Sequence, residues 1–212
     1  MKHYRMILAT LFVALISFTG LTAQQDKIQS QPKTTEHLKF MGIPIDGSPT
    51  AFANKLKSKG FTLKDSPSPN VIWMTGTFAG VSNSDIFIYK SPSSANVYRV
   101  RVTFPEQDSW SQLEMRYSKF KDWLSQKYLL IESKEEFQGY SPERDSSKMT
   151  KLILGDCSYW STYGASTLDG TFLGSVHLEI MSISGENKGF VGVEYEDYLN
   201  GENAKQGFLD DL

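Results

Sequence analysis

The sequence predicts an α+β protein whose helices pack on one face of an antiparallel sheet. The first sign is the alternation of apolar and polar residues, clearest in 96–104 (NVYRVRVTF), which is typical of a strand with one face in water. The second is the order of elements, because a helix, a short strand and three further strands occur twice, in 37–107 and 108–199. This order predicts one domain, 37–199, built from two repeats of one unit.

The N-terminus has the pattern of a signal peptide over residues 1–23. Lys2 and Arg5 are basic, the run 6–21 is apolar and uncharged, and Ala23 closes a stretch of small residues that suits cleavage after it. The segment 24–36 is polar and rich in Gln, which predicts a flexible tether.

A membrane anchor is the alternative, because the apolar run is nearly long enough to span a bilayer. Ser17, Thr19 and Gly20 interrupt this run, and no basic flank follows it, so cleavage is favoured. Gln24 stands where a lipid-bearing cysteine would follow the cleavage site. We therefore expect a periplasmic or secreted protein with no membrane span after signal cleavage.

Charge and cysteine content narrow the function classes. The chain has 22 basic and 24 acidic residues, and loss of Lys2 and Arg5 leaves a net charge of about −4. No basic patch stands out, so nucleic acid is not an expected partner. Cys157 is the single cysteine, so no intramolecular disulfide can form and the fold must depend on its core.

The first helix is marked at both ends. Ser48 can cap it, Pro49 suits its first turn, and Gly60 can adopt the left-handed conformation that ends a helix. Phe52 and Leu56 then share one face. Strands are expected afterwards at 61–64, 71–79, 85–90 and 96–104.

The second helix shows the strongest amphipathic pattern. Asp108 or Ser109 can cap it, and Ser109 with Gln112 has the spacing of a capping box. Its apolar stripe consists of Trp110, Leu113, Tyr117, Phe120 and Leu124.

The rest of the second half is predicted as strands and loops. We expect a short strand at 128–132, a polar loop at 133–148, a strand at 149–163 bent near Gly155, and paired strands at 171–184 and 189–197. Residues 200–212 form an acidic tail, in which Phe208 and Leu209 could dock as a short helix, although fraying is usual at a terminus.

Two resemblances accompany these patterns. The stretch HLKFMGIPIDGSPTAFANKLKSKGF resembles the opening of a group of uncharacterised exported proteins of Gram-negative gut bacteria, and no activity comes with that resemblance. The tandem order of helix and sheet is similar in topology to the β-lactamase inhibitor protein (BLIP-like) architecture, whose repeats present a concave sheet to a partner. Topology alone does not carry a function.

The chain departs from the second family in two respects. Its first half shows one helix where that family has a helix-loop-helix, unless 38–43 forms a short helix. The disulfides typical of that family cannot form with Cys157 alone.

Catalytic and metal motifs are weak. His37 and His177 are the only histidines after the predicted cleavage site, and a strand histidine or a lone Cys157 is more often structural than reactive. Glu194 and Glu196 share a strand face and could supply oxygens to calcium, but a solvated strand face beside an acidic tail is the favoured interpretation. We expect no cofactor, no metal site and no catalytic residue that a local motif identifies.

The aromatic residues suggest a binding surface. Trp73 and Tyr159 or Trp160 would form an apolar platform on the open side of the sheet if they face outward, with Arg99 and Arg101 beside them. The alternative is a second packed layer of core.

The favoured function is therefore an exported, non-enzymatic binding or interaction protein, with another envelope or extracellular protein, or a glycan, as its ligand. One alternative is an envelope hydrolase whose site is assembled from distant strands around His177, Cys157 or two close carboxylates. The other is a structural component of the envelope.

Overall fold

The computed structural model describes residues 35–66 and 68–210. The predicted signal peptide, most of the predicted tether and the last two residues of the predicted tail lie outside this part of the chain. The described residues confirm the α+β fold class, with four helices, an eight-stranded antiparallel sheet and a separate two-stranded sheet.

The first half begins with a small hairpin where an extended lead-in was predicted. Its strands are β1 (Lys39–Phe40) and β2 (Ile43–Pro44), joined by a turn at Met41 and Gly42, which both have positive φ. The helix and strands that follow are α1 (Pro49–Lys57), β3 (Thr62–Lys64), β4 (Val71–Phe78), β5 (Val81–Lys90) and β6 (Val97–Thr103). These agree with the predicted elements to within a few residues.

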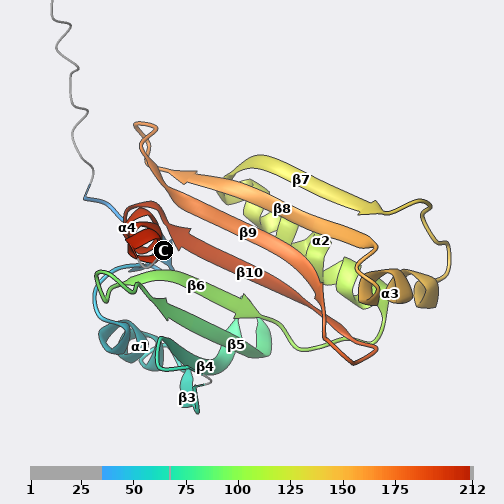
Figure 1. The fold of residues 1–212 in the computed structure, drawn as a ribbon, viewed down its shortest axis with the longest axis horizontal. Coiled ribbons are helices and arrows are strands. Elements are labelled where there is room, and N and C mark those ends of the chain that lie inside the picture. The colour runs from blue at the N-terminus through green and yellow to red at the C-terminus, as the bar shows by residue number, and fades with distance from the viewer. Residues whose placement is uncertain (1–34, 67, 211–212) are drawn as a thin grey trace, which may run out of the picture. The chain divides into compact units, whose positions relative to one another are not determined.

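The second half contains three helices and four strands. They are α2 (Trp110–Lys127), β7 (Leu129–Phe137), α3 (Asp145–Ile153), β8 (Cys157–Ser166), β9 (Phe172–Ser182), β10 (Gly189–Asp197) and α4 (Tyr198–Asp210). The order in the sheet is β3-β4-β5-β6-β10-β9-β8-β7, so the two halves meet where β6 pairs with β10 (Figure 1). Each half thus contributes four neighbouring strands; that the halves are copies of one unit stays a prediction.

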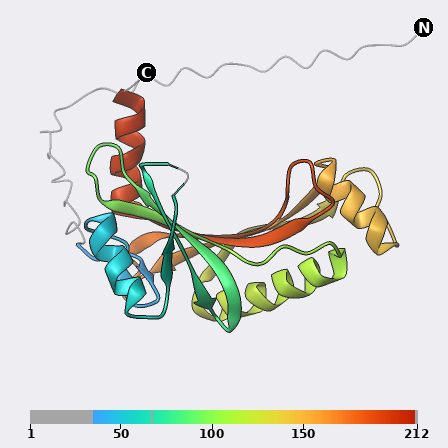
Figure 2. The ribbon, with the colours of Figure 1, turned by 90° about the horizontal axis from the view of Figure 1, so that it is seen from below.

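One face of the sheet carries the core. Helices α1 and α2 pack against the strands on this face, and α4 rises on the other side from the end of β10 (Figure 2). The inward side chains are almost all aliphatic or aromatic and nearly inaccessible to water. They include Met74, Ile86, Ile88, Val100, Val102, Val176, Leu178 and Val193 from the strands, and Phe52, Leu56, Trp110, Leu113 and Tyr117 from the helices.

Helix α1 is capped as predicted, whereas α2 is capped by a residue far along the chain. The Ala51 amide donates to Ser48 Oγ at 3.3 Å, and Gly60 has φ of 91° beyond the helix end. Ser109 occupies the N-cap position of α2 but makes no capping hydrogen bond, so the predicted capping box is wrong. Instead, the Asp145 carboxylate accepts from the amides of Trp110 at 3.0 Å and Ser111 at 2.6 Å.

The region between β7 and β8 differs most from the sequence prediction. Residues 145–153 form α3 where a loop and the start of a strand were expected, and β8 begins only at Cys157. Met149 and Leu152, three residues apart, are buried on one side of α3. Leu152 packs close to Gly189 and Leu113, so contacts with distant segments, rather than a strong local pattern, stabilise this helix.

The ends of two further elements differ from the sequence prediction. Strand β7 extends to Phe137, well beyond the predicted 128–132, and eight of its nine residues are exposed. The predicted acidic tail is helical as far as Asp210, because Asn200 and Ala204 of α4 are buried against the domain. Phe208 and Leu209 on the same helix remain about half exposed.

Candidate functional site

The candidate site lies on the side of the sheet opposite α1 and α2, which we call the open face. Residues directly opposite each other in an antiparallel sheet point to the same side. The register therefore places three rows of side chains on this face: Trp73–Phe87–Arg101–Glu194–His177–Thr162, Tyr89–Arg99–Glu196–Ser175, and Asp85–Thr103–Gly192–Glu179–Trp160.

Two arginines and two glutamates form an ion-pair network at the centre of the open face. The Arg99 guanidinium donates through Nε and Nη2 to Glu196 Oε2, at 3.0 and 2.7 Å, and its Nε lies 3.4 Å from Glu194 Oε1. Arg101 Nε donates to Glu194 Oε2 at 2.8 Å. These residues sit at the junction of β6 and β10, so both halves of the chain contribute to the network.

The network favours the charged form of Arg99, and its arginine side chains are partly exposed. Burial lowers the pKa of Arg99, but Glu194 and Glu196 outweigh burial and raise this pKa above its ordinary value. About a third of the Arg99 and Arg101 side chains is exposed. The glutamates are already paired with arginine, so they do not present free carboxylates to a calcium ion.

An aromatic group borders the network on β4 and β5. The Trp73 and Phe87 rings stack with centroids 5.7 Å apart, and Lys64 Nζ lies 4.4 Å from the Trp73 ring. Trp73 Nε1 is shielded from water and has no hydrogen-bond partner among the described residues.

A second aromatic group lies across the network on β8 and β9. The Trp160 and His177 rings have centroids 5.8 Å apart, and His177 Nδ1 lies 2.9 Å from Thr162 Oγ1. Trp73, Arg99, Arg101 and Trp160 are thus half-buried on one face. The structure separates Tyr159 from them, since it lies on the helix side against Trp110, Phe137 and Tyr117.

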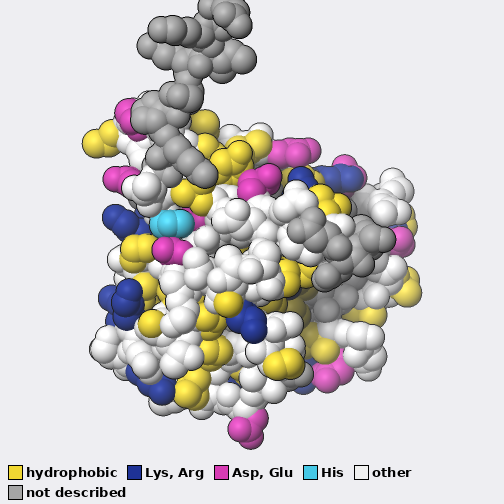
Figure 3. Space-filling view, turned by 60° about the vertical axis from the view of Figure 1, so that its left-hand side comes forward, with side chains coloured by type: hydrophobic (Ala, Val, Ile, Leu, Met, Phe, Trp, Pro, Cys, Tyr) yellow, Lys and Arg dark blue, Asp and Glu magenta, His cyan; other side chains and the backbone are white. Residues whose placement is uncertain are grey.

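Apolar side chains continue the open face toward α4. Phe172 and Tyr198 meet edge to face at 5.5 Å, and each is more than a third exposed. Ile131 and Phe172 lie over Gly164, where the missing side chain leaves them room. Figure 3 shows the side of the molecule that carries α4, where exposed hydrophobic groups alternate with charges of both signs.

The residues weighed for nucleophilic catalysis do not come together. His177 is on the open face, whereas Cys157 pairs with Phe137 and packs against the core on the helix side. Burial, with a smaller effect of Glu114, raises the pKa of the Cys157 thiol to about 12. A thiol with this pKa is protonated at neutral pH and is a poor nucleophile.

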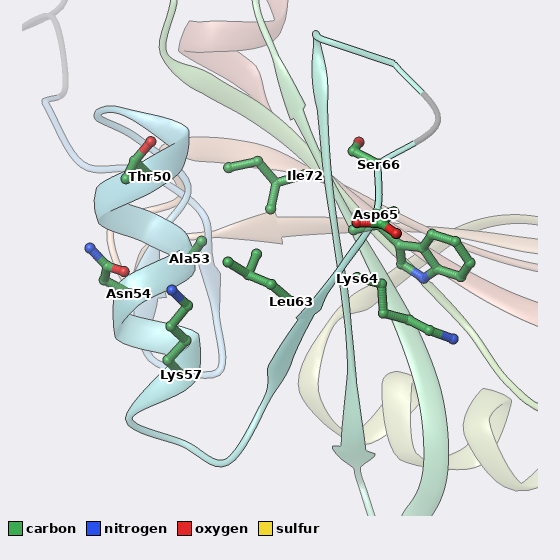
Figure 4. A pocket seen from close by; sticks show the side chains of 10 residues that line it. Thr50, Ala53, Asn54, Lys57, Leu63, Lys64, Asp65, Ser66 and Ile72 are labelled. Carbon is green, nitrogen blue, oxygen red and sulfur yellow. The ribbon is translucent and has the colours of Figure 1, made fainter.

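A pocket of about 410 Å³ lies between α1 and the strand edge at β3 and β4. In Figure 4, Leu63 and Ile72 extend toward Ala53 of α1, while Lys64 points away from the helix. Among the described residues, Asp65 is the only carboxylate that lines this pocket, and neither His177 nor Cys157 reaches it. The pocket therefore offers an apolar recess and no pair of acids.

A polar cluster around the buried Asp197 and Asn200, which we call the clasp, joins the two ends of the domain. It consists of His37, Asp46, Asp197 and Asn200. The Asp197 carboxylate lies 3.0 Å from His37 Nδ1 and accepts from the amides of Leu38 and Asn200, each at 2.9 Å. His37 Nε2 lies 3.5 Å from Asp46 Oδ2, and the Asn200 side chain donates to Asp46 Oδ1 at 2.9 Å.

The clasp was not foreseen, because His37 and Asp197 are 160 residues apart and no spacing rule connects them. Burial raises the pKa of Asp46, but hydrogen bonds from Asn200 and the Gly47 amide, with His37 and Lys55 nearby, outweigh burial and lower it. The clasp side chains mainly bond one another and nearby backbone, so we assign them to stability.

Within residues 35–66 and 68–210, no cluster of three or more His, Cys, Asp or Glu side chains is placed to hold a metal ion. No helix in the same ranges is long and apolar enough to cross a membrane.

Comparison with known proteins adds no relative, since no family model, no curated protein and no solved structure matches this chain. The candidate site therefore depends on its own geometry.

Proposed function

We propose that the mature protein, exported and cleaved after Ala23, is a non-enzymatic binding protein that holds a protein partner on the open face. The observation that carries the proposal is the composition of that face. Half-buried Trp73 and Trp160 lie on either side of one ion-pair network, to which half-buried Arg99 and Arg101 belong, on the sheet face opposite α1 and α2. Trp, Tyr and Arg are the residues most enriched where protein interfaces gain their affinity.

The face is suited to a protein rather than a small molecule. The three rows run across neighbouring strands from β4 to β8, and the pairing of Arg99 and Arg101 with Glu194 and Glu196 keeps the guanidinium groups in place. A partner can stack on the exposed rings and accept from the remaining guanidinium donors without rearranging the sheet. The BLIP-like topology proposed from the sequence favours the same use of a sheet.

The test is capture of envelope and extracellular proteins on three purified forms of the mature chain. These are the wild type, Trp73→Ala/Trp160→Ala, and Trp123→Ala, which removes a more exposed tryptophan from α2 on the other side of the sheet. We expect a partner that the wild type and the Trp123→Ala control retain and the double variant loses, with equal folding by circular dichroism.

Loss of the partner in the Trp123→Ala control alone, or equal retention by all three forms, would place binding elsewhere. Photo-crosslinkers introduced at Ser175 on the open face and at Lys119 on α2 show independently which side of the sheet the partner contacts. Crosslinks confined to Ser175 are expected, and crosslinks confined to Lys119 contradict the proposal.

A further inference from the structure

Strand β7 has one long edge with no neighbouring strand among the residues that the structure describes. It pairs only with β8, at the end of the sheet order, and all its residues except Phe137 are exposed. The opposite edge strand, β3, has only three residues. An exposed strand edge presents backbone donors and acceptors that can pair with another strand.

The centre of β7 is held in a fixed conformation. Ser133 Oγ lies 2.9 Å from Ser161 Oγ, which in turn lies 2.7 Å from the Tyr117 hydroxyl of α2. Glu135 pairs with Lys121 of the same helix. Hydrogen bonds from β8 and α2 therefore prepare this edge for pairing without a cost of ordering.

We propose that β7 pairs antiparallel with β7 of a second copy of this chain, about a two-fold axis at Ser133. Opposed residues in a sheet must point to the same side, so the axis has to pass through a residue rather than between two residues. With the axis at Ser133, Glu132 of each copy lies opposite Lys134 of the other, and no like charges are opposed.

Neighbouring registers are unfavourable. An axis at Glu132, Lys134 or Glu135 places that residue opposite its own copy, and the axis at Lys134 also opposes Glu132 to Glu136. Like charges directly opposed across strands are destabilising. Charged side chains often protect an edge from foreign strands; here the same charges disfavour the registers next to the one centred on Ser133.

The pairing has a geometric consequence for the sheet. Glu132 and Lys134 pair with Thr162 and Trp160 of β8, so they belong to the open face. The open faces of the two copies therefore lie on the same side of one continuous sheet. Leu129 and Ile131, which are 77% and 59% exposed, lie beside the new junction. The shared edge is short, so the dimer should be concentration-dependent.

Sedimentation velocity over a range of concentrations tests the register by charge exchange. Lys134→Glu and Glu132→Lys each create two like-charge pairs across the axis, and each should weaken dimerisation by about tenfold or more. The double variant Glu132→Lys/Lys134→Glu restores opposite charges and should recover wild-type dimerisation. Lys119→Glu makes the same charge change on α2, away from β7, and should have no effect.

Disulfide trapping tests the axis directly, in a Cys157→Ala background. Ser133→Cys should form a covalent dimer, whereas Glu136→Cys should not, because its two copies would be about 20 Å apart along the strands. The proposal is overturned by a chain that stays monomeric at every concentration, by a double variant as weak as the single ones, or by equal trapping at both positions. A different protein strand bound at β7 would also overturn it.

Discussion

The clasp and the open-face network are both built from charged side chains, but their surroundings differ. In the clasp, the Asp197 side chain is fully buried and accepts hydrogen bonds from residues near both ends of the domain. In the network, Arg99, Arg101 and their glutamates lie on adjacent strands, and all but Glu194 are about one-third exposed. The difference teaches that burial, not charge alone, separates groups that stabilise the fold from groups available to a partner.

The largest expected effect is removal of the clasp carboxylate. Asp197→Ala leaves His37 and the amides of Leu38 and Asn200 without their buried acceptor. We expect a loss of about 3–5 kcal/mol in the free energy of unfolding, measured by urea denaturation. A loss below about 1 kcal/mol would show that water replaces the carboxylate and would remove the contrast with the network.

The free energy of unfolding at acidic pH should depend on Asp46 of the clasp. Its pKa is lower in the folded chain than its usual value of 3.8, so ionised Asp46 stabilises the fold above that value. The contribution is lost as pH falls through the lowered pKa. Asp46→Asn should therefore flatten the fall in unfolding free energy between about pH 5 and pH 2. An unchanged slope would contradict this role.

The smallest effect on stability is expected in the network. Arg101→Ala removes one ion pair that is about one-third exposed, so the free energy of unfolding should change by about 0–1 kcal/mol. The same variant should weaken capture of the partner in the binding test. A large loss of stability with unchanged capture would make the network structural, like the clasp.

Much of the fold follows from local patterns in the sequence. Alternation in 96–104 places Arg99 and Arg101 on the wet face, and Ser48 with Gly60 defines α1. Adjacent positions such as Tyr159 and Trp160 must point to opposite sides of a strand, so the sequence alone was enough to place them on different faces. Only one of the pair could join Trp73.

Other features depend on contacts that no local pattern records. Helix α3 shows only Met149 and Leu152 as buried apolar residues, and its first residue, Asp145, caps α2 instead. Strand β7 is polar, exposed and bulged near Ile131, so it lacks a clear alternation. The clasp joins His37 to Asp197 across nearly the whole domain, and only the folded arrangement reveals it.

The position of β10 at the centre of the sheet affects the timing of folding. A chain made from its N-terminus acquires β3–β6 first and β7–β9 next, and the strand that joins the two sets, 189–197, follows them. Contacts between residues far apart in the sequence form slowly. The two sets of strands must therefore wait for β10, the last strand to be made, before the sheet can close.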